Sequence, residues 1–419
     1  MTSDSPLFKK PANSIAIYVH IPYCTTKCPY CDFNSYAIIP STDKAFQNRF
    51  AEFQEQKYAD ALIAELRYQA SNPGWNARSC HSLFFGGGTP SLFSAEQLNR
   101  IITAIFSHFP PTQNVEVTIE ANPSTLAEQI EHDKLAELKM GGVNRISVGA
   151  QSFNAGKLKS LGRLHSAKDI SSSIANIAAA GFSNYNIDLI SGTPGETKEI
   201  WINDLTEAIR LSPTHISCYS LTIEPGTEFS VLLRKGKFAE ATEEDQAEAY
   251  FTTQRILTNA GYYQYEISNF CLPSFECIHN LSYWCWDDYL SLGAGAHSFL
   301  KSNSPSPEQT AKRWANIPRP AHYIQRALNG GDCAQNIEVV DPKQAELEYL
   351  MCHIRLATGV NLAKFKELFA TDFINKYQEV IRPFADRNLL QISDSRVRIT
   401  PAGFIFCDEL LAQLVRSVD

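Results

Sequence analysis

The sequence lacks the features of a membrane or secreted protein. No window of about 18 consecutive apolar residues occurs in its 419 residues, and residues 1–13 lack the apolar core of a secretion signal. Basic residues are also few, with 37 Lys and Arg against 45 Asp and Glu, which gives a net charge of -8. We therefore expect a cytoplasmic protein that binds no nucleic acid and meets membranes only through partners.

An even-numbered cysteine framework is also missing. The chain has eleven cysteines, an odd count in a chain much longer than the small secreted scaffolds that depend on disulfides. Eight of them are scattered, at Cys80, Cys218, Cys271, Cys277, Cys285, Cys333, Cys352 and Cys407. We expect these to be free thiols in a reducing compartment.

Three cysteines stand apart from this scatter. Cys24, Cys28 and Cys31 fall within eight residues, directly after an apolar segment that alternates like a strand. Thiols at this spacing on a loop can turn toward one soft-metal centre. Three ligands would leave one iron of an iron-sulfur cube open to an exchangeable ligand. A structural zinc site is the alternative, although no second closely spaced Cys or His pair follows.

Alternating strand and helix patterns predict an α/β fold. Strand-like segments cover residues 15–20, 81–85, 115–121, 145–151, 185–190 and 215–222. Helix-like segments lie between them, and this alternation favours parallel strands joined by crossover helices. Six such units can curl into most of a barrel, whose binding residues gather at the carboxyl ends of the strands.

A glycine-rich segment follows the second of these strands. Gly86, Gly87 and Gly88 precede Thr89 and would let the backbone approach a ligand closely, although a tight turn explains them equally well.

Polar residues lie near the ends of the next three strands. Glu120, Gln151 and Asp188 could bond a ribose hydroxyl, and capping of the next helix is the simpler alternative. Asp188 is the most informative, because a charge between two apolar residues is costly unless it is paired or near solvent. Arg163 could pair with a carboxylate, although an exposed arginine is the more ordinary role.

The Cys-x-x-x-Cys-x-x-Cys spacing, with Tyr30 before the third cysteine, resembles the signature of radical S-adenosylmethionine (SAM) proteins. That resemblance implies a partial (β/α)6 barrel in which the three cysteines hold a [4Fe-4S] cluster. It also implies that SAM binds the open iron and is cleaved to a 5'-deoxyadenosyl radical. Our candidate cofactor-binding residues are Tyr18, Tyr30, Phe33, Gly86, Gly87, Gly88, Thr89, Glu120, Gln151, Arg163 and Asp188.

A histidine far downstream suggests a second ligand. His279 lies beside large aromatic residues, and a neutral imidazole there could be an axial ligand of haem iron, although ordinary hydrogen bonding is commoner for an isolated histidine. Residues 279–284 read His-Asn-Leu-Ser-Tyr-Trp and resemble the His-Asn-x-x-Tyr-Trp motif of the HemW-type haem chaperones, relatives of oxygen-independent coproporphyrinogen III oxidase. The resemblance implies haem as cargo on His279 and acceptor haem proteins as partners.

Three regions are expected along the chain. Residues 1–240 form the radical SAM barrel, and residues 241–335 form an extension with the His279 motif and a Ser-, Pro- and Asn-rich linker over 301–319. Residues 336–419 read as helices, a hairpin over 389–400 and a last helix, which suggests a smaller winged-helix-like domain. Its many acidic residues favour a lid or docking role over DNA binding. We expect a monomer or homodimer.

An oxygen-independent oxidase that decarboxylates the propionates of coproporphyrinogen III is the alternative activity. Those enzymes resemble this chain, but they usually carry a further cysteine where this chain has Phe33, and a longer segment before the cysteine loop. The residue at position 33 and the His279 motif therefore favour the chaperone. On this hypothesis the cluster and SAM regulate haem holding or transfer, or support a redox step, without necessarily turning over a substrate.

Overall fold

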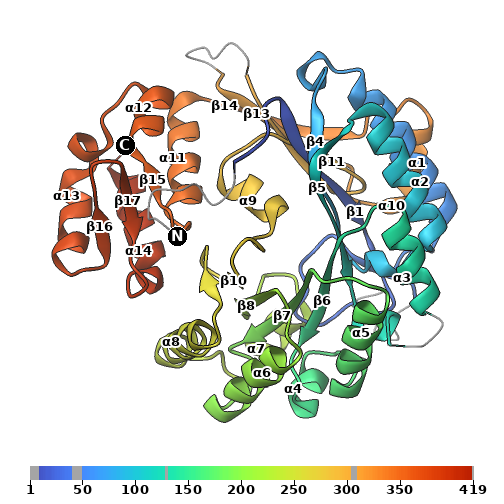
Figure 1. The fold of residues 1–419 in the computed structure, drawn as a ribbon, viewed down its shortest axis with the longest axis horizontal. Coiled ribbons are helices and arrows are strands. Elements are labelled where there is room, and N and C mark those ends of the chain that lie inside the picture. Colours follow the sequence, from blue (N-terminus) through green and yellow to red (C-terminus); the bar gives the residue numbers. More distant parts are fainter. Residues whose placement is uncertain (1–8, 40–49, 128–130, 303–308, 418–419) are drawn as a thin grey trace.

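The computed structural model describes residues 9–39, 50–127, 131–302 and 309–417. The six expected parallel strands are confirmed and lie side by side in chain order. They are β1 (Ser14–Ile21), β4 (Ser79–Gly87), β5 (Pro111–Ala121), β6 (Arg145–Gln151), β7 (Tyr185–Ser191) and β8 (His215–Ser220). Figure 1 shows this sheet curving like part of a barrel wall, so the α/β partial-barrel prediction is confirmed.

Later strands extend the same sheet at both edges. Beyond β8 lie β10 (Asn269–Cys271) and β9 (Tyr263–Gln264). Beyond β1 lie β11 (Tyr289–Leu292), β12 (His297–Lys301), β13 (Ala311–Asn316) and β14 (Ala334–Val340). The short pair β2 (Tyr23–Cys24) and β3 (Tyr36–Ala37) frames the cysteine loop. The boundaries of the three expected regions remain predictions.

The linker expected over residues 301–319 is wrong in part. Within its described residues the chain forms β13, which pairs with β12 on one side and β14 on the other. Ala311, Trp314 and Asn316 are buried there. Polar and proline-rich neighbours conceal this short strand in the sequence. Residues 303–308 of the expected linker lie outside the described residues.

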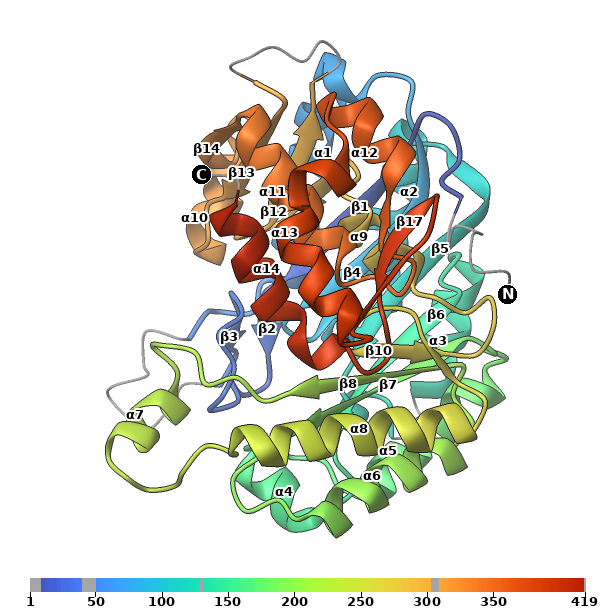
Figure 2. The same ribbon diagram turned by 90° about the vertical axis from the view of Figure 1, so that its left-hand side faces the viewer.

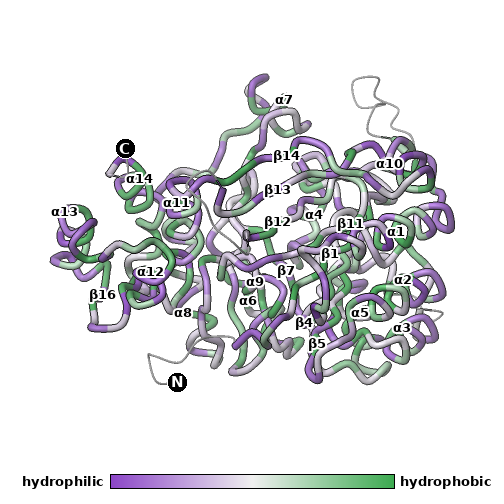
Figure 3. Tube along the Cα trace, turned by 90° about the horizontal axis from the view of Figure 1, so that it is seen from above, coloured by the Kyte–Doolittle hydropathy of each residue, from purple (hydrophilic) through white to green (hydrophobic). Residues whose placement is uncertain are grey.

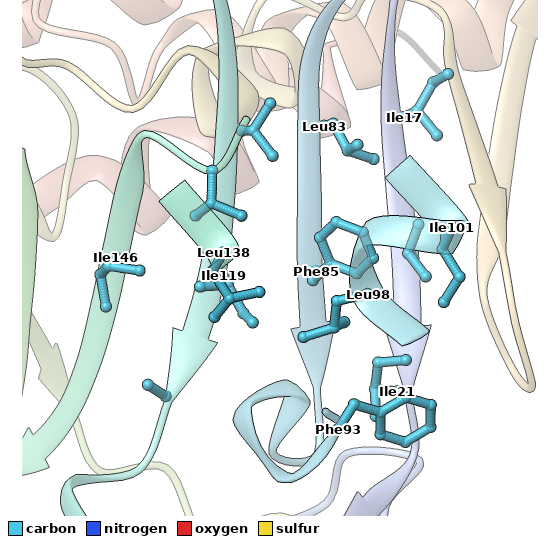
Figure 4. Close-up of a cluster of buried hydrophobic side chains, with 14 of the residues drawn as sticks. Ile17, Ile21, Leu83, Phe85, Phe93, Leu98, Ile101, Ile119, Leu138 and Ile146 are labelled. Carbon is cyan, nitrogen blue, oxygen red and sulfur yellow. The ribbon is translucent and has the colours of Figure 1, made fainter. Parts of the chain in front are cut away.

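Helices cover the outer face of the sheet because its strands alternate. On β1 the residues Ile15, Ile17 and Val19 enter the core beneath the helices, and the residues between them face the barrel interior. Figure 4 shows this core, with Phe85 and Ile119 from the sheet close to Leu98 and Leu138 from two helices. The helices of this region are α1 (Glu55–Ala70), α2 (Ala95–His108), α3 (Glu131–Met140), α4 (Ala155–Ser160), α5 (Ala167–Ala179), α6 (Lys198–Arg210), α7 (Glu228–Arg234), α8 (Glu243–Asn259) and α10 (Pro320–Leu328).

One short helix, α9 (Ile278–Trp284), lies on the concave side of the sheet (Figure 1). Its position inside the curve brings His279 among the inward-facing side chains of β4.

The C-terminal region forms a smaller helical unit, as expected, which lies to the left of the sheet in Figure 1 and in front of it in Figure 2. The hairpin is confirmed, because β16 (Leu390–Ile392) and β17 (Arg396–Ile399) pair in antiparallel fashion, and β15 (Val360–Asn361) joins them. Its helices are α11 (Pro342–His353), α12 (Leu362–Phe369), α13 (Phe373–Asp386) and α14 (Cys407–Arg416). Apolar and polar residues alternate along α13 in Figure 3, because Phe373, Tyr377, Ile381 and Phe384 form its buried side. None of the described helices has the length and apolarity that a membrane crossing needs.

Candidate functional site

A cavity of about 520 Å³ opens at the carboxyl ends of the central strands, where a partial barrel is expected to bind its ligands. This volume suits one small-molecule cofactor. Twelve of the fifteen sequence-predicted site residues line it, namely Cys24, Cys28, Tyr30, Cys31, Phe33, Gly87, Gly88, Thr89, Glu120, Gln151, Arg163 and Asp188.

The three cysteines of the loop reach this cavity together. Cys31 N donates to Cys28 O at 3.1 Å, which bends the loop, and Thr89 Oγ1 donates to Cys24 Sγ at 3.6 Å. Burial, with smaller contributions from Cys31 and Cys28, raises the pKa of the Cys24 thiol to about 11, against the lowering effect of the Thr89 hydrogen bond. Three thiols on one loop beside a ligand-sized cavity fit the donor set of an iron-sulfur cluster.

Among the described residues, no three His, Cys, Asp or Glu side chains are arranged to hold a single metal ion. A zinc ion needs its thiolates about 2.3 Å away on one centre, whereas each thiolate of a four-iron cube binds a different iron. The finding therefore concerns sites for single metal ions and not the site of a four-iron cluster.

The glycine segment lies against the cysteine loop. Gly88 N donates to Ile21 O at 2.7 Å, and Thr89 N donates to Tyr23 O at 2.8 Å. A Cβ on Gly88 would come within 2.6 Å of Tyr23 O, a backbone atom that cannot easily move. The close approach that requires this glycine is thus to the protein's own loop, while Gly87 and Gly88 still face the cavity.

Arg163 crosses the cavity to the cysteine loop. Its Nη2 and Nε donate to the Tyr30 hydroxyl at 2.7 Å and 3.2 Å, so its partner in this structure is a hydroxyl and not the suggested carboxylate. Burial and the neighbouring Cys28 raise the pKa of Tyr30 above its usual value, while Arg163 lowers it. The neutral hydroxyl can therefore accept from the guanidinium and fix the aromatic ring beside the cavity.

The two carboxylates of the site lie on β5 and β7, with β6 between these strands. Glu120 accepts a hydrogen bond from Gly87 N at 3.0 Å, and burial together with Asp188 raises its pKa to about 7. Asp188 accepts from Asn186 Nδ2 at 2.7 Å and from Ser147 Oγ at 3.1 Å. Burial raises the pKa of Asp188 as well, and the hydrogen bonds oppose that rise. The paired carboxylates give this wall of the cavity two acceptors suited to hydroxyl groups.

Tyr18, Gly86 and His279 do not line the cavity. They lie together in the barrel interior, where a Cβ on Gly86 would come within 2.9 Å of the Tyr18 ring. The Tyr18 and His279 ring centres are 6.1 Å apart, and Phe84 stacks on His279 with centres 5.0 Å apart.

His279 has hydrogen-bond partners for both ring nitrogens. Ser82 Oγ lies 2.6 Å from Nδ1 and the Tyr283 hydroxyl lies 2.9 Å from Nε2. Burial lowers the pKa of His279 to about 3, so the ring is neutral at physiological pH. Glu116 fixes the start of α9, because it accepts from the backbone N–H groups of Ile278 and His279 at 3.3 Å and 3.1 Å.

Several polar residues of the site were missed in the sequence. Ser147 and Tyr219 line the cavity, and Glu116 and Arg145 are buried in the interior. Each lies an even number of residues from another inward-facing residue of its strand, as Glu116 does from Glu120. Because alternate strand residues share a face, polar residues at this spacing could have identified the interior.

Family comparisons cover both ends of the chain. The family model of the radical SAM superfamily matches residues 18–208, and the family model of the HemN C-terminal domain matches residues 340–406. The radical SAM match implies a [4Fe-4S] cluster and SAM as ligands.

Proteins with the printed name heme chaperone HemW match almost the full length. The protein from Haemophilus influenzae is 35% identical over 95% of this chain and 97% of its own length. Those from Escherichia coli and Bacillus subtilis are each 32% identical, over 95% and 94% of this chain and 97% of their own lengths.

Among solved structures, coproporphyrinogen III oxidase (HemN) from Escherichia coli superposes with a TM-score of 0.76. It is 20% identical, and the match covers 97% of this chain and 91% of that one. At this identity the likeness concerns the fold.

Proposed function

The chain belongs to the HemW family of haem chaperones within the radical SAM superfamily, and we propose that it binds haem and delivers it to acceptor haem proteins. The observation that carries the proposal is the match to HemW at 35% identity over 95% of the chain. The oxidase likeness at 20% identity bears on the fold alone.

In the proposal, the cavity at the strand ends holds a [4Fe-4S] cluster on Cys24, Cys28 and Cys31, with SAM beside it. When bound, these groups supply an electron and a source of a 5'-deoxyadenosyl radical. Three free thiols on one cavity wall and two hydroxyl acceptors, Glu120 and Asp188, on another support this arrangement.

His279 is the proposed haem ligand. Coordination requires Nε2 to exchange the Tyr283 hydroxyl for iron, while Ser82 keeps its hydrogen bond to Nδ1 and orients the ring. The side chain is 2% exposed, so α9 has to move to admit a porphyrin. The neutral state of the ring supports this role, because only an unprotonated nitrogen can bind iron.

The proposal includes a cytoplasmic location. All eleven cysteines lie in the described part of the chain, and none forms a disulfide there. Free thiols and an iron-sulfur cluster both suit a reducing compartment.

The test measures both candidate activities in one anaerobic preparation. After the cluster is reconstituted, haem is titrated and followed by its absorbance, the loaded protein is mixed with an apo-cytochrome, and a parallel sample receives coproporphyrinogen III and SAM. We expect haem binding and transfer without protoporphyrinogen. Protoporphyrinogen formation at a useful rate would overturn the chaperone assignment.

Two variants separate the cluster from haem binding. Cys28→Ala should abolish iron loading, because two thiols cannot hold the cluster. His279→Ala should weaken haem binding and leave the iron content intact. Full iron retention in the first variant, or unchanged haem spectra in the second, would contradict the corresponding assignment.

A further inference from the structure

Three buried charged side chains lie outside the proposed cofactor cavity. Lys157 on α4, Glu196 after β7 and Asp204 on α6 have 3%, 8% and 0% of their side-chain surface exposed. Lys157 Nζ lies 3.0 Å from Asp204 Oδ2, also pairs with Glu196, and lies 4.9 Å from the centre of the Trp201 ring. A buried ion pair seldom adds much net stability, so stability alone does not explain this charged cluster. The hydrogen bonds of its two carboxylates indicate another role.

The two carboxylates hold the chain just beyond β6 and β7. Asp204 Oδ2 accepts from Ser152 Oγ at 2.8 Å, and its Oδ1 accepts from Phe153 N at 2.7 Å. Glu196 Oε1 accepts from Gly192 N at 3.0 Å, and its Oε2 accepts from Thr193 Oγ1 at 3.2 Å. Lys157 joins both carboxylates, so the ends of the two strands are tied to each other.

The residue before Ser152 needs such support. Gln151 has φ of 65°, the left-handed region that residues other than glycine seldom adopt. A β-bulge precedes it, since Val148 pairs with Ile187 and Gln151 pairs with Leu189, which leaves two residues of β6 opposite Asp188. Bulges redirect side chains beside sites, and a strained residue persists only where its surroundings fix it.

We propose that Lys157, Glu196 and Asp204 are positioning residues for SAM, which they affect by fixing Gln151 and the end of β7. This inference rests on the proposed binding of SAM in the cavity. The described residues that line the cavity include Gln151 and Asp188 but no member of the charged cluster. The three charged residues can therefore affect SAM only through the ends of β6 and β7.

The first test measures SAM affinity by equilibrium dialysis in iron-loaded protein. Ser152→Ala and Asp204→Asn should each weaken SAM binding by about tenfold, as loss of an orienting partner typically does, without loss of iron. Ser152→Ala removes a single hydroxyl and keeps the ion pairs, so it tests the proposal even where Asp204→Asn fails to fold. Wild-type affinity in both variants would overturn the positioning role alone. No SAM binding by the wild type would overturn the proposed function with it.

A double-mutant cycle tests the route. Since the Asp204 contact with Ser152 fixes the end of β6 and thereby Gln151, Ser152→Ala should cost no further SAM affinity in a Gln151→Ala background. Independent, additive losses would overturn the proposal.

Glu346 provides a matched control for general instability. It accepts from Lys376 Nζ at 2.7 Å and from the Tyr377 hydroxyl at 2.5 Å, so it forms a similar carboxylate, lysine and hydroxyl set in the C-terminal unit. Glu346→Gln should lower the melting temperature and leave SAM affinity unchanged. An equal loss of SAM affinity in this control would show that affinity follows global stability, which would overturn the proposal.

Discussion

At the scale of single residues, Glu65 on α1 is a buried carboxylate with three donors. It accepts from Gly293 N at 2.9 Å, Asn316 Nδ2 at 2.6 Å and the Tyr323 hydroxyl at 2.6 Å. Burial raises its pKa from 4.5 to about 7, against the effect of these hydrogen bonds. Between pH 4.5 and about pH 7, Glu65 therefore keeps its proton in the folded state and releases it in the unfolded state. The contribution of Glu65 to stability is therefore complete below the unfolded pKa and is lost as the pH rises toward 7.

Glu65→Gln should remove this pH dependence, because the amide cannot ionise. Between about pH 5 and about pH 7, the free energy of unfolding of the wild type should fall relative to the variant by up to about 1.4 kcal/mol per pH unit. Urea unfolding of the iron-free protein at several pH values measures the difference. The exposed Glu137→Gln should follow the wild type, and parallel slopes for Glu65→Gln and wild type would refute the prediction.

Tyr283 controls the availability of the proposed haem ligand. Its hydroxyl occupies His279 Nε2 at 2.9 Å, so Tyr283→Phe should free that nitrogen and raise haem affinity several-fold. Haem titration followed by absorbance checks this, with Tyr289→Phe as a control that keeps a neighbouring aromatic ring. Weaker haem binding by Tyr283→Phe would instead indicate that the hydroxyl contacts the haem or its iron.

The residues of the site were predictable where local spacing determines their position. The three thiols and the glycines are close in sequence, so their arrival at one cavity follows from one loop and one strand end. The partners of Arg163 and His279 were not predictable. Arg163 meets Tyr30 across the barrel and His279 meets Ser82 of another strand, and these contacts depend on tertiary packing.

At the scale of elements, the turn between β11 and β12 supports the cysteine loop. Ala294 N donates to the Tyr58 hydroxyl at 2.8 Å, and that hydroxyl donates to His20 O at 2.9 Å. Asn34 Nδ2, from the other side of the loop, donates to Ala294 O at 2.8 Å. The turn between β11 and β12 is thus hydrogen-bonded to the chain on both sides of the three cysteines, directly at Asn34 and through Tyr58 at His20.

Gly293→Ala should break this support. The residue has φ of 108°, and an added Cβ would come within 2.5 Å of His20 O. Gly142, with φ of 107° and nothing within 4 Å of an added Cβ, is the matched control. Gly142→Ala should cost about 1 to 2 kcal/mol of strain, and Gly293→Ala clearly more, with poorer iron retention. Denaturant unfolding and iron analysis check both; equal costs would show that the contact with His20 does not matter.

The six parallel strands were predictable because each has a clear apolar pattern between helices. The strand β13 was not, since its buried residues are only Ala311, Trp314 and Asn316 and its partners come from far along the chain. The bulge before Gln151 was also hidden, because a shift of register depends on the neighbouring strand.

At the scale of the whole molecule, the C-terminal unit shares a core with the extended sheet. Trp286, two residues beyond α9, packs with Phe299 of β12 and Tyr349 of α11 at ring-centre distances of 5.3 Å and 6.3 Å. Glu348 accepts from Trp286 Nε1 at 3.4 Å and also pairs with Arg313 of β13. The unit is therefore fixed close to the helix that carries His279.

Trp286→Ala should loosen that unit without unfolding the barrel. Truncating a buried tryptophan costs about 3 to 5 kcal/mol, and here the loss falls on the shared core. Hydrogen exchange should become faster in α11 to α14 and in α9, while β1 to β8 keep their protection. Trp75→Ala, which empties a similarly buried site against Trp314 in the barrel region, should not reproduce this pattern. Because haem can reach His279 only if α9 moves, selective loosening should also speed haem binding; uniform exchange across the chain would rule out this route.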